Sequence, residues 1–285
     1  MFIKHQLDDG RNVLIEKIGQ PIVYLDNWAI NDISLNPTFR QRFITIMKSR
    51  KGTLRISVSN IVELLKQTDQ KQIESILSLI DSVDAGLINT NFREVIALEN
   101  GMLKGDVDEN PSNHLDLIRV YLLAQNWPEL WTVSGFVRSV LENSSEKHFS
   151  ESWDQFAKKM KGFLNAVRSD NKYANKSKTR SAITRKAGKK YDRATRELFQ
   201  LGFGFVLQNH DMTMSSNEWH DFFHLIVPVA YCDIVLLDKR WTTFVNQTNL
   251  TYPDIAFVFN RKSMDVFFNK LETLNFAENG LSMAS

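Results

Sequence analysis

The sequence has a single cysteine, Cys232, among its 285 residues. One thiol cannot form an internal disulfide, and this composition is typical of proteins in a reducing compartment. The longest apolar run, Leu225 to Cys232, includes Pro228 and is far shorter than the stretch of about 20 residues that a membrane-spanning helix needs. The first residues are too charged for a signal peptide; they include Asp8, Asp9, Arg11, Glu16 and Lys17. We therefore expect a soluble, cytoplasmic protein that does not contact a membrane.

Motifs of several common enzyme classes are also missing. Gly202-Phe203-Gly204 lacks the third glycine of a dinucleotide-binding fingerprint, and neither a phosphate-binding loop nor a nucleophile elbow occurs. His220 and His224 have the spacing of a helical zinc pair, but the glutamate of the metalloprotease motif and a supporting cysteine cluster are absent. These absences argue against nucleotide-cofactor, serine-hydrolase and zinc-protease chemistry.

The charge of the chain is unevenly distributed. Net charge is only +2, but the segment 158–196 has fourteen Lys or Arg residues against two acids, so this segment carries +12 and the remainder −10. A basic segment of this kind can hold a phosphate backbone, and Tyr173 and Tyr191 could stack on bases. A solvated surface loop is the alternative interpretation. The candidate nucleic-acid-binding residues are Lys172, Lys176, Lys178, Arg180, Arg185, Lys186, Lys189 and Lys190.

Short apolar, β-branched runs near both ends of the chain indicate buried strands. Segments with helical periodicity separate these runs, and this alternation predicts an α/β fold with a mainly parallel sheet. We expect one core from residues 1–104 and 216–285, split by a helical insertion at 105–215 that contains the basic segment 158–196. The predicted strands are Ile22 to Leu25, Leu54 to Val58, Leu87 to Ile88, Ile234 to Leu237 and Ile255 to Phe259.

Acidic residues follow three of these strands. Asp26 and Asp238 come directly after a strand, where ligands of open parallel sheets bind, so both side chains are expected in one crevice. An aspartate at this position can equally cap the following helix. Glu63 also follows a strand, but it comes three residues after Asn60, which is the spacing of a capping box. Structural and chemical roles are therefore both open for these acids.

A further acidic stretch precedes the strand that ends in Asp238. Asp221 lies in a helical pattern, and His224 shares its face three residues later. Pro228 is expected to end or kink this helix. His224 is a candidate for holding a phosphate or a water near the acids; alternatively it is the hydrogen-bonded partner of one of them. Asp233 opens the strand that follows.

In four places, in the same order along the chain, the sequence resembles the PIN-like nuclease superfamily. These are the strand ending in Asp26, the passage Ser57 to Leu64, the stretch Asp221 to His224 and the stretch Asp233 to Lys239. The resemblance implies a PIN-like three-layer α/β core with a central, mainly parallel sheet; the long basic insertion is not part of that family's usual core. The acids that the resemblance assigns to metal binding are Asp26, Glu63, Asp221 and Asp238, with Asp233 as an additional candidate.

Several carboxylates in one crevice repel one another, and a hard divalent cation relieves that repulsion. We therefore expect Mg²⁺ or Mn²⁺ as the cofactor of a metal-dependent nuclease, with Asp26 and Asp238 as the first choices for direct ligands. RNA is favoured over DNA as the substrate because many members of the superfamily cut RNA. Such an endoribonuclease could act as a toxin or a host-defence effector, with an inhibitor as its partner.

Two other classes of function compete with this prediction. A non-catalytic nucleic-acid-binding module would use the basic insertion alone, so its affinity for nucleic acid would not depend on Mg²⁺ or on Asp26. An interaction scaffold built on the helical middle of the chain would have no affinity for nucleic acid.

Overall fold

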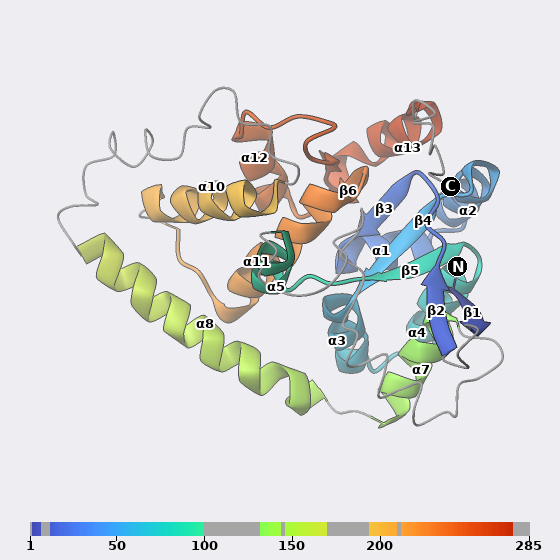
Figure 1. Ribbon diagram of the computed structural model, residues 1–285, viewed down its shortest axis with the longest axis horizontal. Coiled ribbons are helices and arrows are strands. Elements are labelled where there is room, and N and C mark those ends of the chain that lie inside the picture. The colour runs from blue at the N-terminus through green and yellow to red at the C-terminus, as the bar shows by residue number, and fades with distance from the viewer. Residues whose placement is uncertain are drawn as a thin grey trace.

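The centre of the molecule is a five-stranded, all-parallel β-sheet flanked by helices. The computed structural model describes residues 2–6, 12–99, 132–143, 146–169, 194–209 and 212–275. The strand order is β5-β4-β3-β6-β7, so strands from both ends of the chain share one sheet (Figure 1). The predicted α/β fold with a parallel sheet is confirmed. The strands are β3 (Ile22–Leu25), β4 (Thr53–Ser57), β5 (Asp84–Ile88), β6 (Ile234–Leu236) and β7 (Phe257–Phe259).

The strand register brings distant segments of the chain to the same edge of the sheet. β3 lies in the middle, with β4 on one side and β6 on the other, where Leu25 is opposite Leu236. β6 also pairs with β7, where Leu236 is opposite Phe259. Because all five strands run in the same direction, their carboxyl ends meet along one edge, which we call the carboxyl edge.

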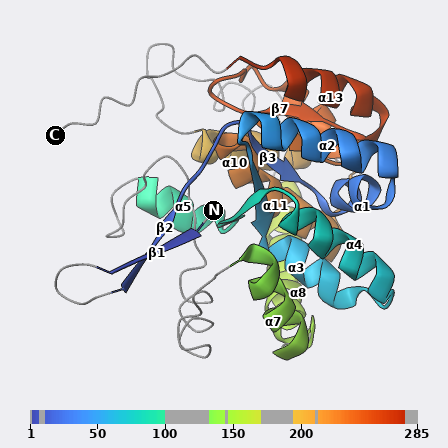
Figure 2. The same ribbon diagram turned by 90° about the vertical axis from the view of Figure 1, so that its right-hand side faces the viewer.

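Alternate side chains of the strands point to opposite faces of the sheet, and each face has its own apolar core. On the first face, Val23, Leu25 and Ile56 pack against helices that Figure 2 shows together on one side of the sheet. The helices covering this face are α1 (Asn27–Leu35), α2 (Pro37–Arg50), α3 (Val58–Lys66), α4 (Gln70–Asp81), α7 (Val133–Asn143) and α13 (Met264–Thr273).

The second face has an aromatic core. Tyr24 and Val235 of the sheet pack there with many phenylalanine and tryptophan side chains. A Cβ atom at Gly202 would lie 2.3 Å from the Phe222 ring, so glycine allows α10 to approach α11 closely. The helices on this face are α5 (Phe92–Glu99), α8 (Glu146–Ser169), α10 (Thr195–Gln208), α11 (Ser216–Tyr231) and α12 (Lys239–Gln247).

The end of α10 is fixed by a side chain from α8. The Arg168 guanidinium donates hydrogen bonds to the carbonyl oxygens of Val206 (2.6 Å) and Asn209 (2.9 Å), and to that of Met212. The last carbonyls of a helix have no partner within the helix, so this contact satisfies acceptors that would otherwise need water. This contact therefore holds α8 and α10 together on the aromatic face.

Two sequence-based expectations differ from the structure. Pro228 was expected to end or kink its helix; the helix does not end there, because α11 continues to Tyr231 through a stretch of buried apolar residues. The opening of the chain forms an antiparallel hairpin of β1 (Phe2–Gln6) and β2 (Asn12–Glu16), which the sequence did not predict. Among the described helices, none has the length and apolar composition needed to cross a bilayer.

Candidate metal centre at the carboxyl edge

Asp26 follows β3 at the centre of the carboxyl edge. Its backbone amide still donates to the carbonyl of Leu236 (3.1 Å), and its side-chain Oδ1 accepts a hydrogen bond from the Asn27 amide (2.8 Å), so it caps α1. Helix capping therefore accounts for one of the two carboxylate oxygens of Asp26. Burial of the half-buried carboxyl group raises its pKa to about 7; the Asn27 amide opposes this shift, and the charges of Asp238 and Glu63 add to it.

Asp238 occupies the equivalent position after β6. It stands at the N-cap of α12, but its side chain makes no capping hydrogen bond and is exposed. Its backbone carbonyl instead accepts bonds from the Thr242 amide (2.9 Å) and hydroxyl (3.0 Å). Helix capping therefore does not explain the presence of this carboxylate at the carboxyl edge.

Glu63 lies in α3 (Val58–Lys66), which starts directly after β4. The suggested capping box between Asn60 and Glu63 is wrong, because the helix begins three residues earlier and its capping box joins Ser57 to Asn60. The Glu63 carboxylate instead pairs with Lys66 at 2.7 Å, with 37% of the Glu63 side chain exposed. This leaves Glu63 without a structural task at the start of the helix.

Asp221 reaches the same region from α11. This helix has its own capping box between Ser215 and Glu218, so Asp221 in its second turn plays no part in capping. Burial is the largest cause that raises the Asp221 pKa to about 8; the negative charges of Asp26, Asp238, Glu63 and Glu218 add to it in that order. The mutual repulsion places all four predicted acids in one electrostatic cluster, although they come from four separate segments of the chain.

Three polar side chains that were not among the predicted site residues hold this cluster in place. The buried Asn60 amide group donates to the carbonyl oxygen of Leu25 (3.1 Å) and to Asn27 Oδ1 (2.9 Å), which ties α3 to the end of β3 and the start of α1. Ser57, the cap of α3, bonds the hydroxyl of Tyr24 (3.1 Å). Burial and then the charge of Asp26 raise the Tyr24 pKa, so Tyr24 stays neutral. The only sequence signal for these residues was polarity next to a buried strand.

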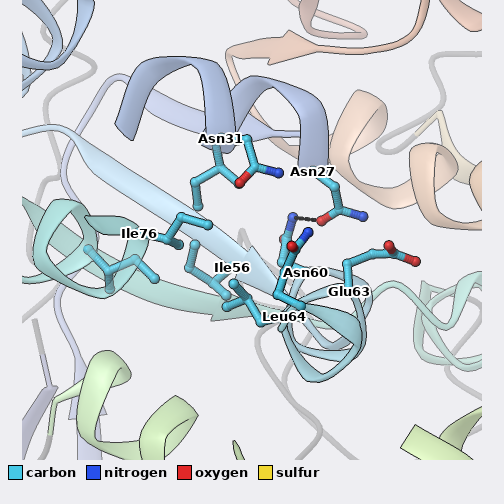
Figure 3. A pocket seen from close by; sticks show the side chains of 10 residues that line it. Asn27, Asn31, Ile56, Asn60, Glu63, Leu64 and Ile76 are labelled. Atoms are coloured by element: carbon cyan, nitrogen blue, oxygen red, sulfur yellow. Dashed lines mark hydrogen bonds between the residues drawn. The ribbon is translucent and has the colours of Figure 1, made fainter. Parts of the chain in front are cut away.

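A pocket opens beside the cluster on the side of α1 and α3. Figure 3 shows that Asn27, Asn31, Asn60 and Glu63 line this pocket together with apolar side chains, among them Ile56. The dashed contact in that view is the Asn60–Asn27 hydrogen bond described above. Amide groups and the Glu63 carboxylate therefore share the lining of this pocket with apolar side chains.

Asp233 does not join the cluster. It precedes β6, at the opposite edge of the sheet, where its Oδ2 accepts a hydrogen bond from the Ile22 amide (2.7 Å). Burial raises its pKa to about 6, while this bond and one from Tyr252 oppose the shift. The suggestion of Asp233 as an additional metal ligand is therefore corrected: its carboxylate ties the start of β3 to β6 and lies a full strand length from Asp26.

The remaining candidates are placed only in part. His224 is buried in α11 one turn after His220, and the two rings meet edge to face with their centroids 3.9 Å apart. Of the segment 158–196, the structure describes 158–169 and 194–196. The proposed nucleic-acid-binding residues lie outside the described residues: Lys172, Lys176, Lys178, Arg180, Arg185, Lys186, Lys189 and Lys190.

The donor set of the cluster fits a hydrated divalent cation. Across the described ranges, no three carboxylate, imidazole or thiol groups are close enough to one another to hold an ion together. Mg²⁺ does not need such a cage, because it keeps several waters and binds through one or two carboxylates together with substrate phosphates. Comparisons with protein-family models, curated protein sequences and solved structures found no match.

Proposed function

We propose that this protein is a Mg²⁺- or Mn²⁺-dependent nuclease with a PIN-like three-layer core that is split by the insertion 105–215. One observation carries the proposal. Four carboxylates from separate segments interact electrostatically at the carboxyl edge, where two of them have pKa values raised to about 7 and about 8. Grouping acids where burial, and then mutual repulsion, disfavours their charged forms is typical of a site built for a cation. The four acids are Asp26, Glu63, Asp221 and Asp238.

Each acid has a separate task in this proposal. Asp26 and Asp238 bind the cation directly, since they lie next to each other where β3 and β6 end. Glu63 and Asp221 accept hydrogen bonds from the attacking water and orient it. When bound, the cation lowers the pKa of that water and stabilises charge on the leaving oxygen. Asp221, with its pKa of about 8, holds a proton at neutral pH without a cation and loses it when a cation binds nearby, because the positive charge favours the ionised carboxylate.

We assign the phosphodiester bonds of nucleic acid as the substrate, with single-stranded RNA as the first choice and endonucleolytic cleavage as the reaction. The basic segment 158–196 supports this choice, because the remainder of the chain is acidic and cannot attract a polyanion by its overall charge. The preference for RNA over DNA follows from the resemblance to the PIN-like superfamily.

The test is cleavage of end-labelled single-stranded RNA and DNA in Mn²⁺, Mg²⁺ or EDTA. We expect cutting only with a cation, and a loss of at least about 100-fold in Asp26→Asn and Asp238→Asn, since even indirect partners of a metal ligand matter by 10–100-fold. Glu74→Gln is the matched control and should cut normally. Glu74 is an exposed acid of α4 that pairs with Arg138. If nothing is cut and no cation binds, the nuclease proposal is wrong, and the non-catalytic binding module replaces it.

A further inference from the structure

Beyond the acids, the carboxyl edge ends in a cationic group at β7. The neighbouring strands β6 and β7 end with Leu236 opposite Phe259, and Asp238 and Arg261 each come two residues after that pair. Neighbouring strands are about 4.8 Å apart, which makes the position of Arg261 the next one along the edge after the acid cluster. Arg261 opens the short 3-10 helix η1 (Arg261–Ser263) that leads into α13.

The Arg261 side chain is exposed and yet held in one orientation. Its Nε lies 2.8 Å from Asp32 Oδ2 and its Nη2 lies 3.1 Å from Asp32 Oδ1, while the guanidinium carbon stands 5.1 Å from the centre of the Trp28 ring. Asp32 and Trp28 both belong to α1, the helix that Asp26 caps. The side chain is nevertheless 64% exposed. Asp32 occupies Nε and one proton of Nη2, so the two Nη1 protons and the second Nη2 proton are left as donors.

An exposed ion pair of this kind contributes little to stability. What the two contacts provide is a fixed guanidinium, and a preorganised planar donor group is suited to phosphate oxygens. Two lysines stand nearby in the chain. Lys262 follows Arg261, and Lys239 follows Asp238; both are exposed, and neither forms an ion pair within the described part of the protein.

We propose that Arg261, oriented by Asp32 and Trp28 and assisted by Lys262 and Lys239, binds the phosphate backbone of a nucleic-acid strand that lies across the acid cluster. This inference rests on the proposed nuclease function and gives it a substrate path. Acids repel the phosphates on either side of the one being cut, so the strand needs cations beside the cluster. The β7 end of the carboxyl edge supplies them, and the strand therefore runs from Asp26 and Asp238 toward η1.

The test measures binding without cleavage. A fluorescent single-stranded 20-mer, as RNA and as DNA, is titrated with the full-length protein in EDTA, and the anisotropy gives the affinity between 50 and 200 mM salt. Arg261→Ala should weaken binding about tenfold and lower the slope of log affinity against log salt by about 0.7, because the variant neutralises one phosphate fewer on a single strand. The weakening should be independent of base sequence, because phosphate contacts carry no sequence information.

Arg42→Ala is the matched control for folding and for charge. Arg42 also holds a carboxylate with two nitrogens (Glu272, 2.8 and 3.1 Å) and also lies over an aromatic ring (Phe268, 4.9 Å), but its partner is in the last turn of α13, away from the carboxyl edge. We expect the affinity of this variant to equal that of the wild type.

Three outcomes would overturn the inference: equal affinity of Arg261→Ala and wild type, equal weakening in both arginine variants, or no binding by the wild type. Cleavage by the wild type in Mn²⁺ separates this result from the nuclease proposal. If the wild type cuts RNA while Arg261→Ala binds normally, only the substrate path is wrong. If Arg261→Ala binds weakly and the wild type cuts nothing, the phosphate site stands and the catalytic proposal fails.

Discussion

Asp26→Asn should make the metal-free protein more stable, because it removes a charge that the fold disfavours. The asparagine oxygen can accept the same hydrogen bond from the Asn27 amide, so the cap of α1 is preserved. What disappears is the cost of ionising a half-buried carboxyl group next to Asp238 and Glu63, a cost that raises the pKa of Asp26 to about 7.

The magnitude follows from the number of protons bound. Between an ordinary pKa of 3.8 and the folded value of about 7, the folded state keeps a proton that the unfolded state has lost, so the free energy of unfolding falls as the pH rises through this range. The full shift corresponds to about 4 kcal/mol. Because the carboxyl group keeps some contact with water, we expect about half of this, ~2 kcal/mol in favour of the variant at pH 8, and a smaller gain at pH 5.

Urea unfolding of both proteins in EDTA at pH 5 and pH 8 measures this difference, and a gain of ~2 kcal/mol corresponds to a rise in Tm of about 4–8 °C. Glu74→Gln, which removes an exposed carboxylate, should show no comparable gain at either pH. Adding Mn²⁺ should stabilise the wild type more than Asp26→Asn, since a ligand that binds only the folded state adds to its stability. The reasoning is refuted if the variant gains nothing at pH 8, or gains equally at both pH values.

Two further predictions follow. The affinity for Mn²⁺ should rise between about pH 6 and pH 8.5, and binding should release protons, because the raised pKa values of Asp26 and Asp221 keep them partly protonated until a cation binds. Calorimetry in buffers of different ionisation enthalpy measures the affinity and the number of protons released. An affinity that does not depend on pH contradicts the assignment. Gly202→Ala should cost about 1–3 kcal/mol by overpacking against Phe222, whereas Gly162→Ala, with no other side chain within 4 Å, should gain about 0.5–1 kcal/mol. Urea unfolding checks this pair, and equal effects would contradict the packing.

The parallel sheet was predictable because each strand has a recognisable pattern in a short stretch of sequence. Ile22 to Leu25 and Ile234 to Leu237 are continuous apolar runs, which is the pattern of strands buried on both faces, and both are present. The positions of Asp26 and Asp238 followed from the same runs, since a residue directly after a parallel strand lies at the carboxyl edge. Local sequence patterns were therefore enough to predict the parallel sheet and the positions of two of the four acids.

The remaining features depend on contacts between segments that the sequence separates widely. Asp233 stands next to the same strand as Asp238, but only the pairing of β6 with β3 reveals that it bonds the Ile22 amide at the far edge. The role of Asn60 likewise requires that α3 begin at Val58, directly after β4 without a loop. Because the helix starts three residues earlier than expected, Asn60 stands at N3 of the capping box instead of at the N-cap, and Glu63 lies outside the box. No local signal fixed that boundary.

The acids differ in the hydrogen bonds and ion pairs that they already make within the protein, and this difference affects the order in which a cation would contact them. Asp26 gives one oxygen to the cap of α1, and Glu63 is neutralised in part by Lys66, so both have a competing partner. Asp238 is exposed and makes no capping bond. A hydrated cation therefore contacts Asp238 first and Asp26 second. The raised pKa values of Asp26 and Asp221 fall only after the cation has bound. On this account Asp238→Asn should lower cation affinity more than Glu63→Gln, because Glu63 must leave Lys66 before it can contribute.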